Sequence, residues 1–332
     1  FNNPETTESY TLSLHDALPS WQLEWKFKVD RLSKAIAVLP IPLQGDVPLQ
    51  AQAIVRTDGE TLQVTELRVT AGRNDISGEI SYSLNGTDNH RQKIDGRLAS
   101  EYFNLNDLFP KKEKKYLFGN EDMPLAWADR YDVDLEYSAG HLVRRNYEIT
   151  DATALLTSLD GLVNIRLQGI SAGGDLEVQL DLDTQVDPHP ANYAYDWKHL
   201  DLDLLPVALK GKRDISGSLS TRGYISGSGR SLHEIVQSGN GYLFTELEGI
   251  KFPRGREELL TTTPLSITEQ VLRGVSPWAE RKKYYDIKCG VIGMLITDGV
   301  ADSPAPPNHT IALKAEEFEL LEIGRASCRE SV

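Results

Sequence analysis

The sequence has no long apolar run and very few cysteines. No stretch reaches the roughly 18 apolar residues that a membrane-spanning helix needs, so we expect neither such a helix nor an intact signal peptide in these residues. Only two of the 332 residues are cysteines, which excludes a disulfide framework, because Cys328 lies in a terminal segment set aside below. Cys289 lies in an alternating, strand-like pattern, and we expect a small buried thiol there rather than a nucleophile or ligand.

The sequence also lacks an excess of basic residues. Asp and Glu outnumber Lys and Arg by 49 to 35, which gives a formal net charge of -14. A surface this acidic repels phosphate backbones, so nucleic acid is not an expected partner.

Motifs for metal binding and phosphate binding are absent as well. The histidines form no His-x-His or His-x-x-x-His pair, and no phosphate-binding loop occurs. Asp196, Asp201 and Asp203 form an acidic cluster that could imitate a calcium site or a glycosidase pair, although a solvated strand edge is the simpler interpretation. We therefore expect no catalytic residue, no cofactor, no metal site and no enzymatic activity.

Both ends of the chain resemble the conceptual translation of a sequencing-library adapter. Tyr10–Pro19 reads YTLSLHDALP and Glu322–Val332 reads EIGRASCRESV. Suitable codons for the first segment followed by an isoleucine, where the chain has Ser20, give IGRASCRERV when they are reverse-complemented and read in a shifted frame. This differs from residues 323–332 only at Ser331. We therefore set residues 1–20 and 322–332 aside as an adapter-derived scar and expect the remainder to be a truncated fragment.

What the sequence has in abundance is alternation with a period of two. Trp21–Val29, Tyr131–Tyr137 and Leu176–Leu182 each place apolar residues on one side and polar residues on the other, the pattern of a strand with one buried face. We expect a mostly β protein: a long twisted antiparallel sheet, or sheets, of repeated strands curled into a trough or sandwich. One or two short helices are expected in the C-terminal third.

The apolar faces of these strands are the candidate binding surface. Each must be covered by another sheet, by the opposite wall of a curled sheet, or by acyl chains, because an exposed apolar sheet face promotes aggregation. A filled core remains the simpler alternative for any single strand. The candidate groove-lining residues are Trp25, Phe27, Val133, Leu135, Val178, Leu180, Ile287 and Val291.

An internal repeat divides the chain. Phe103–Pro110 aligns with His199–Pro206 at an offset of 96 residues, sharing Asp, Leu and Pro at three of the last four positions. We infer a first β repeat over residues 21–110, a second over 111–206, and a C-terminal segment over 207–321.

The C-terminal segment begins with a unit that changes period twice. In Leu219–Gly249, an alternating strand ends in glycine, Ser231 precedes a short amphipathic helix, and a small-residue turn leads to a second strand. The order of Gly227, Gly229-Arg230-Ser231-Leu232 and Asn240-Gly241 resembles the C-terminal region of the AsmA family of bacterial envelope proteins. Asp298-Gly299-Val300 is similar to the end of a strand in that family.

The resemblance implies a periplasmic protein anchored to the inner membrane by an N-terminal helix that this chain lacks. It also implies a non-enzymatic role in envelope biogenesis, with an apolar β groove that shields or conducts phospholipid between the inner and outer membranes. The alternative is a structural or regulatory adaptor in outer-membrane protein assembly, with a dry β core and edge-strand pairing. A third hypothesis is an enzyme that acts on envelope glycans through Asp201 and Asp203.

Overall fold

A computed structural model describes residues 20–29, 47–83, 91–108, 121–144, 146–205, 215–253, 284–302, 311–315 and 318–319. All of its strands belong to one 16-stranded sheet. The strands are β1 (Trp21–Val29), β2 (Leu49–Thr57), β3 (Thr61–Ala71), β4 (Asn74–Ser83), β5 (Gln92–Asn104), β6 (Tyr131–Arg144), β7 (Tyr147–Leu159), β8 (Leu162–Ser171), β9 (Gly174–Asp183), β10 (Pro190–Asp201), β11 (Ser216–Ser228), β12 (Asn240–Pro253), β13 (Tyr284–Thr297), β14 (Val300–Asp302), β15 (Ile311–Ala315) and β16 (Phe318–Glu319).

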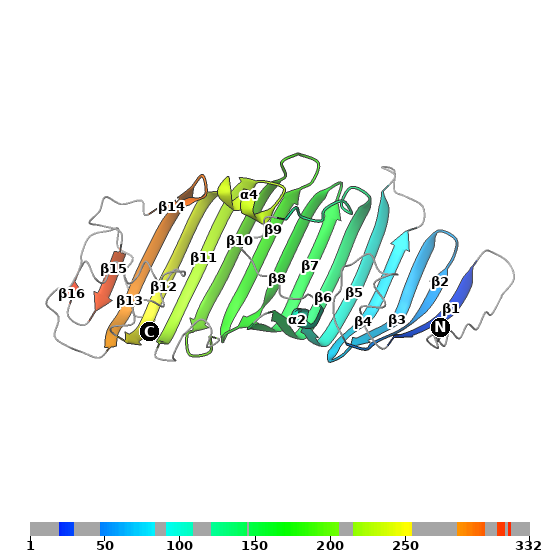
Figure 1. Cartoon of the computed structure of the whole chain (residues 1–332), viewed down its shortest axis with the longest axis horizontal. Coiled ribbons are helices and arrows are strands. Elements are labelled where there is room, and N and C mark those ends of the chain that lie inside the picture. Colours follow the sequence, from blue (N-terminus) through cyan, green and yellow to red (C-terminus); the bar gives the residue numbers. More distant parts are fainter. Residues whose placement is uncertain are drawn as a thin grey trace, which may run out of the picture.

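The strands follow one another in the sheet in the order of the sequence. Neighbours pair from β1 through β13, then β15 and β16, while β14 pairs with β13 off this path. Figure 1 shows this succession along the longest axis of the molecule. The sheet is open, with β1 at one edge, and does not close on itself. The prediction of a long, mostly β sheet is confirmed, and within the described residues it is one sheet rather than a sandwich of two.

Two features differ from the predicted fold. β5 and β6 pair in parallel, with Gln92 opposite Tyr131, whereas every other pair is antiparallel. A parallel pair needs a crossover connection instead of a hairpin, because the chain must return to the same end of the sheet. The short helix α2 (Leu105–Leu108) begins this crossover, outside the C-terminal third where helices were expected. Alternation within each strand carries no information about the direction of its neighbour.

The unit predicted over residues 219–249 is present as strand, helix and strand. β11 leads into α4 (Leu232–Gln237), and β12 follows. Ser231 caps the helix, because its hydroxyl accepts a hydrogen bond from the Glu234 N–H at 3.2 Å. Figure 1 shows α4 and α2 at opposite ends of the strands.

Three strand irregularities occur at non-glycine residues with left-handed backbone angles. Glu66 in β3 has φ 51°, and the pairings with β2 and β4 both shift beside it. His199 in β10 has φ 54°, and the register with β11 shifts between Trp197 and Leu200. Asp151 in β7 has φ 50°, beside a shift in the pairing with β8. Each is a β-bulge that inserts one extra residue. The bulge in β10 keeps Trp197 and Leu200 on the same face of the sheet although their numbers differ by three.

The two aligned segments both follow a long strand but continue differently. Leu105–Leu108 forms α2 after β5, whereas residues 202–205 form a turn after β10. β5 and β6 pair directly across the inferred boundary between the first and second repeat, so the sheet is continuous there. The duplication itself stays a prediction.

Candidate functional site: the apolar face of the sheet

The strand register places six of the eight candidate groove residues on one face of the sheet, called here the apolar face. Trp25 and Phe27 on β1 face the same way as Ala53 and Ala51 on β2, and the register carries this face across the sheet. It reaches Val133 and Leu135 on β6 through β5, and Val178 and Leu180 on β9 through β7 and β8. Sequence alternation alone could not show that strands so far apart in the chain share a face.

The remaining two candidates lie on β13. Val291 is opposite Glu246 and therefore lies on the other face, while its neighbour Ile292 is 7% exposed on the apolar face. The placement of Val291 in the groove is wrong, because the alternation of β13 was assigned one residue out of phase. Ile287 pairs with Ile250 through its backbone, and the side chain of Ile287 is not among those that the structure describes.

The prediction of a free thiol at Cys289, on the same strand, is also wrong, because Cys289 is disulfide-bonded.

The middle of the apolar face consists of two rows in cross-strand register, called here the central strip. The first row is Val64, Ile80, Gly96, Leu135, Leu156, Ile165, Leu180, Tyr193, Ile225, Gly241 and Ile296. The second row is Leu67, Gly78, Leu98, Tyr137, Ala154, Leu167, Val178, Tyr195, Gly223, Leu243 and Met294. The strip carries no charged residue from β3 to β13.

The central strip is largely uncovered by the described residues. Gly223 is its only buried member. Ile165 is 38% exposed and Tyr193 is 36% exposed. At the edge strand β1, Trp25 is 37% exposed and stacks on Phe27 with ring centroids 5.7 Å apart.

The two ends of the strands are covered. Residues 121–130, called here the strap, are the described part of the crossover between β5 and β6. Its Met123, Leu125, Trp127 and Ala128 pack with Ile235 of α4 against residues at one end of β8, β9 and β10. At the other end of β10, Leu200 and Leu202 pack with Leu247, Ile250 and Ile292. The sequence pattern does not predict the strap, because a short irregular segment has no periodicity.

Hydrogen bonds hold the strap to neighbouring elements. The Met123 N–H donates to the Arg230 carbonyl at 2.8 Å. Arg91 donates from Nη1 to the Ala128 carbonyl at 3.0 Å and lies 3.7 Å from Asp132. The Arg230 guanidinium makes a two-pronged ion pair with Asp187, which holds the pKa of that carboxyl below its usual range.

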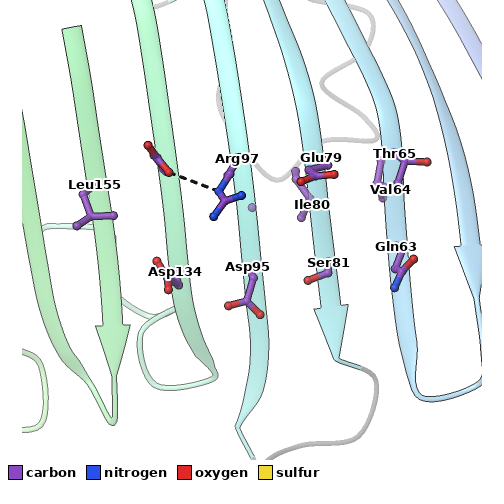
Figure 2. A pocket seen from close by; sticks show the side chains of 12 residues that line it. Gln63, Val64, Thr65, Glu79, Ile80, Ser81, Asp95, Arg97, Asp134 and Leu155 are labelled. Atoms are coloured by element: carbon purple, nitrogen blue, oxygen red, sulfur yellow. Dashed lines mark ion pairs between the residues drawn. The ribbon is translucent and has the colours of Figure 1, made fainter.

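The opposite face of the sheet carries most of the charged side chains, together with the exposed Tyr224, Tyr242 and Leu295 on β11 to β13. It contains an open hollow of about 460 Å³ over β3 to β7, lined by residues that include Gln63, Glu79, Asp95, Arg97 and Asp134. Figure 2 shows these side chains on adjacent strands, and the dashed line marks the ion pair between Arg97 and Glu136 at 3.5 Å. Four of its twelve lining residues are carboxylates, and Val64, Ile80 and Leu155 line it as well.

Asp196 and Asp201 of the acidic cluster make separate contacts. Asp196 lies on the polar face, 3.4 Å from Lys198. β10 ends at Asp201, whose Oδ1 accepts a hydrogen bond from the Asp203 N–H at 2.7 Å, as in a turn cap. Among the residues that the structure describes, no group of three His, Cys, Asp or Glu side chains could hold a metal ion.

One catalytic pattern does occur in the sequence, at Gly169–Gly173, which reads Gly-Ile-Ser-Ala-Gly. A serine nucleophile needs an exposed hydroxyl on a turn from strand to helix. Ser171 is instead 4% exposed at the hairpin between β8 and β9, and its hydroxyl donates to the Glu148 carbonyl at 2.8 Å. Its role is structural.

The described residues contain no helix long and apolar enough to cross a membrane. Comparison of the chain with protein-family models, with curated proteins and with solved structures finds no match.

Proposed function

We propose that this chain shields acyl chains of phospholipids on its apolar face, as part of a non-enzymatic envelope protein that conducts lipid between the inner and outer membranes. The central strip is the observation that supports the proposal. It is apolar from β3 to β13, while the described covering segments lie at the strand ends. The periplasmic location and the inner-membrane anchor rest on the resemblance to the AsmA family.

The dimensions and energetics of the strip suit an acyl chain. Ten inter-strand spacings of about 4.8 Å make the strip roughly 50 Å long. This exceeds the length of acyl chain in one leaflet, which is about half of the roughly 30 Å hydrocarbon core. Each methylene removed from water contributes about 0.8 kcal/mol. A lipid on the strip would therefore bind strongly without any specific polar contact, as a conduit for several lipids requires.

The test compares two variants on neighbouring residues of β9. Leu180 lies in the central strip, and Gln179 points to the opposite face, where its amide donates to Asp181 at 3.0 Å. Purified chain is incubated with vesicles of phosphatidylethanolamine and phosphatidylglycerol, re-isolated, and examined for bound phospholipid by native mass spectrometry. We expect Leu180→Lys to reduce bound lipid tenfold or more, because it places a charge in the strip, and Gln179→Lys to leave it unchanged. A chain that carries no lipid, or two variants with equal effects, would overturn the proposal.

The exposed edge of β1 favours the adaptor in outer-membrane protein assembly as a second candidate. β1 pairs only with β2 among the described strands, so its other edge can accept a partner strand. A photocrosslinker at Gln22 that captures an assembly protein, together with one at Leu180 that captures no lipid, would favour this function over the first.

A further inference from the structure

A third row of the apolar face lies beside the central strip, at the strand ends that the strap and α4 cover. Its members are in register from β6 to β10, and each is at most 6% exposed: Val133, Ser158, Val163, Leu182 and Ala191. The first row of the central strip lies two positions further along each strand and is not buried. Over these strands, the covering segments therefore decide whether two rows or three are open.

Ser158 places a polar group without a hydrogen-bond partner in this row. It is 3% exposed, and among the described residues its Oγ is the one buried side-chain nitrogen or oxygen that has no partner. Its cross-strand neighbours are Val133 and Val163. Val163 and Leu156, which lies two residues before Ser158 on β7, belong to the cluster in which the strap packs. A hydroxyl buried in such surroundings loses its hydrogen bonds to water, so it destabilises the arrangement with the strap in place.

Ser171 on the neighbouring strand β8 shows how a buried serine is usually accommodated. It is 4% exposed, and its hydroxyl donates to the Glu148 carbonyl at 2.8 Å. Since buried hydroxyls generally have partners, the exception at Ser158 needs an explanation. A second arrangement, in which the strap has moved and water reaches the hydroxyl, provides one.

The strap can move without losing its own structure. Its Ala128 N–H donates to the Leu125 carbonyl at 2.8 Å, a hydrogen bond that does not involve the sheet. At the α4 side, the Met123 N–H donates to the Arg230 carbonyl at 2.8 Å. The Arg230 side chain is anchored by an ion pair with Asp187, whose two side chains are 58% and 55% exposed, and such a pair contributes little. The strap is therefore held mainly by its apolar side chains.

We infer that the strap is a displaceable cover that opens from the third row, hydrates Ser158, and widens the central strip from two rows to three over β6 to β10. The apolar contacts of Met123, Leu125 and Trp127 favour the closed arrangement. The dehydrated Ser158 hydroxyl opposes it and so makes opening easier than the burial of the row alone would allow. An acyl chain on the widened strip would cover the row in place of the strap, but the opening itself does not depend on the proposed function.

The experiment measures amide hydrogen exchange of the Met123 N–H in the lipid-free chain. This N–H bonds to Arg230, outside the strap, so it exchanges when the strap leaves that position. Ser158→Ala removes the unpartnered hydroxyl without adding bulk. We expect it to slow the exchange about fivefold or more, since fivefold corresponds to about 1 kcal/mol. Ser171→Ala, the matched control, removes a buried hydroxyl that has a partner and should not slow it.

Urea unfolding of the same variants separates the possible results. Unchanged exchange with a higher free energy of unfolding in Ser158→Ala would mean that Ser158 is hydrated only when the whole chain unfolds, and would overturn the inference. Unchanged exchange with unchanged stability would mean that a water molecule binds Ser158 beneath the closed strap, which would overturn it as well. No lipid is present, so none of these results bears on the lipid-shielding function, which the vesicle experiment tests.

Discussion

Neighbouring residues on the same face of β8, β9 and β10 differ sharply in burial. Val163, Leu182 and Ala191 are only 3%, 5% and 2% exposed, and they lie in register with one another beneath the strap and α4. Two positions along each strand, Ile165 is 38% exposed, Leu180 is half-buried, and Tyr193 is 36% exposed.

The comparison shows that alternation decides which face a residue takes, whereas covering segments decide whether that residue is core. Val163 and Ile165 have the same chemistry and the same orientation, yet only one contacts the cluster that contains Ala128 and Ile235. The covered row stabilises the fold, and the open row leaves apolar surface for a ligand. A single strand thus contributes one residue to the stabilising core and another to the open apolar surface.

The largest effect should come from shortening one leucine in each row. Leu182→Ala removes buried methyl groups beneath the strap and should lower the free energy of unfolding by about 2–4 kcal/mol. Leu180→Ala, two residues away on the same strand, should cost roughly 1 kcal/mol, because its side chain is already partly hydrated. Urea unfolding followed by circular dichroism measures both. Equal losses would mean that the two rows are equally buried and would remove the distinction.

A smaller effect should appear at alkaline pH. Burial raises the pKa of Tyr193, and the electrostatic interaction with nearby Tyr195 raises it further. Burial also raises the pKa of Tyr195. Unfolded tyrosines ionise near pH 10 while the folded ones keep their protons, so the free energy of unfolding should fall as pH rises above about 10. The double variant Tyr193→Phe and Tyr195→Phe should fall less steeply in urea unfolding between pH 8 and 11. An unchanged slope would show that both hydroxyls are fully hydrated.

The smallest effect concerns the support of the strap. The pKa of Asp187 is lowered chiefly by its hydrogen bonds to Arg230, whose carbonyl accepts from the strap at Met123. The ionised pair should contribute above the unfolded pKa of about 4 and be lost as pH falls through the lower folded value. Arg230→Gln should therefore speed amide hydrogen exchange in the strap at pH 7, with the difference from wild type shrinking below pH 4. Exchange at β13, away from the strap, serves as the control, and equal acceleration there would indicate general destabilisation.

Much of the fold was predictable because period and turn chemistry are local. Trp21–Val29 forms β1 with the predicted bounds. The turn between β2 and β3 is equally local, since Asp58 Oδ1 accepts from the Thr61 N–H at 2.7 Å. Ser231 was correctly predicted to cap a helix, because the cap uses atoms only three residues apart. The face of Val291 was predicted incorrectly, since a one-residue error in phase moves every side chain of a strand to the other face of the sheet.

The sequence by itself determined that this chain forms strands with one apolar side, and that Leu219–Gly249 folds as strand, helix and strand. These features depend on contacts between residues close in the chain. Only the tertiary structure decided that β5 and β6 are parallel, that the strap covers one end of the apolar face, and that Ser158 lies buried there without a hydrogen-bond partner among the described residues. These depend on cross-strand register and on the path of the crossover, which no local pattern encodes.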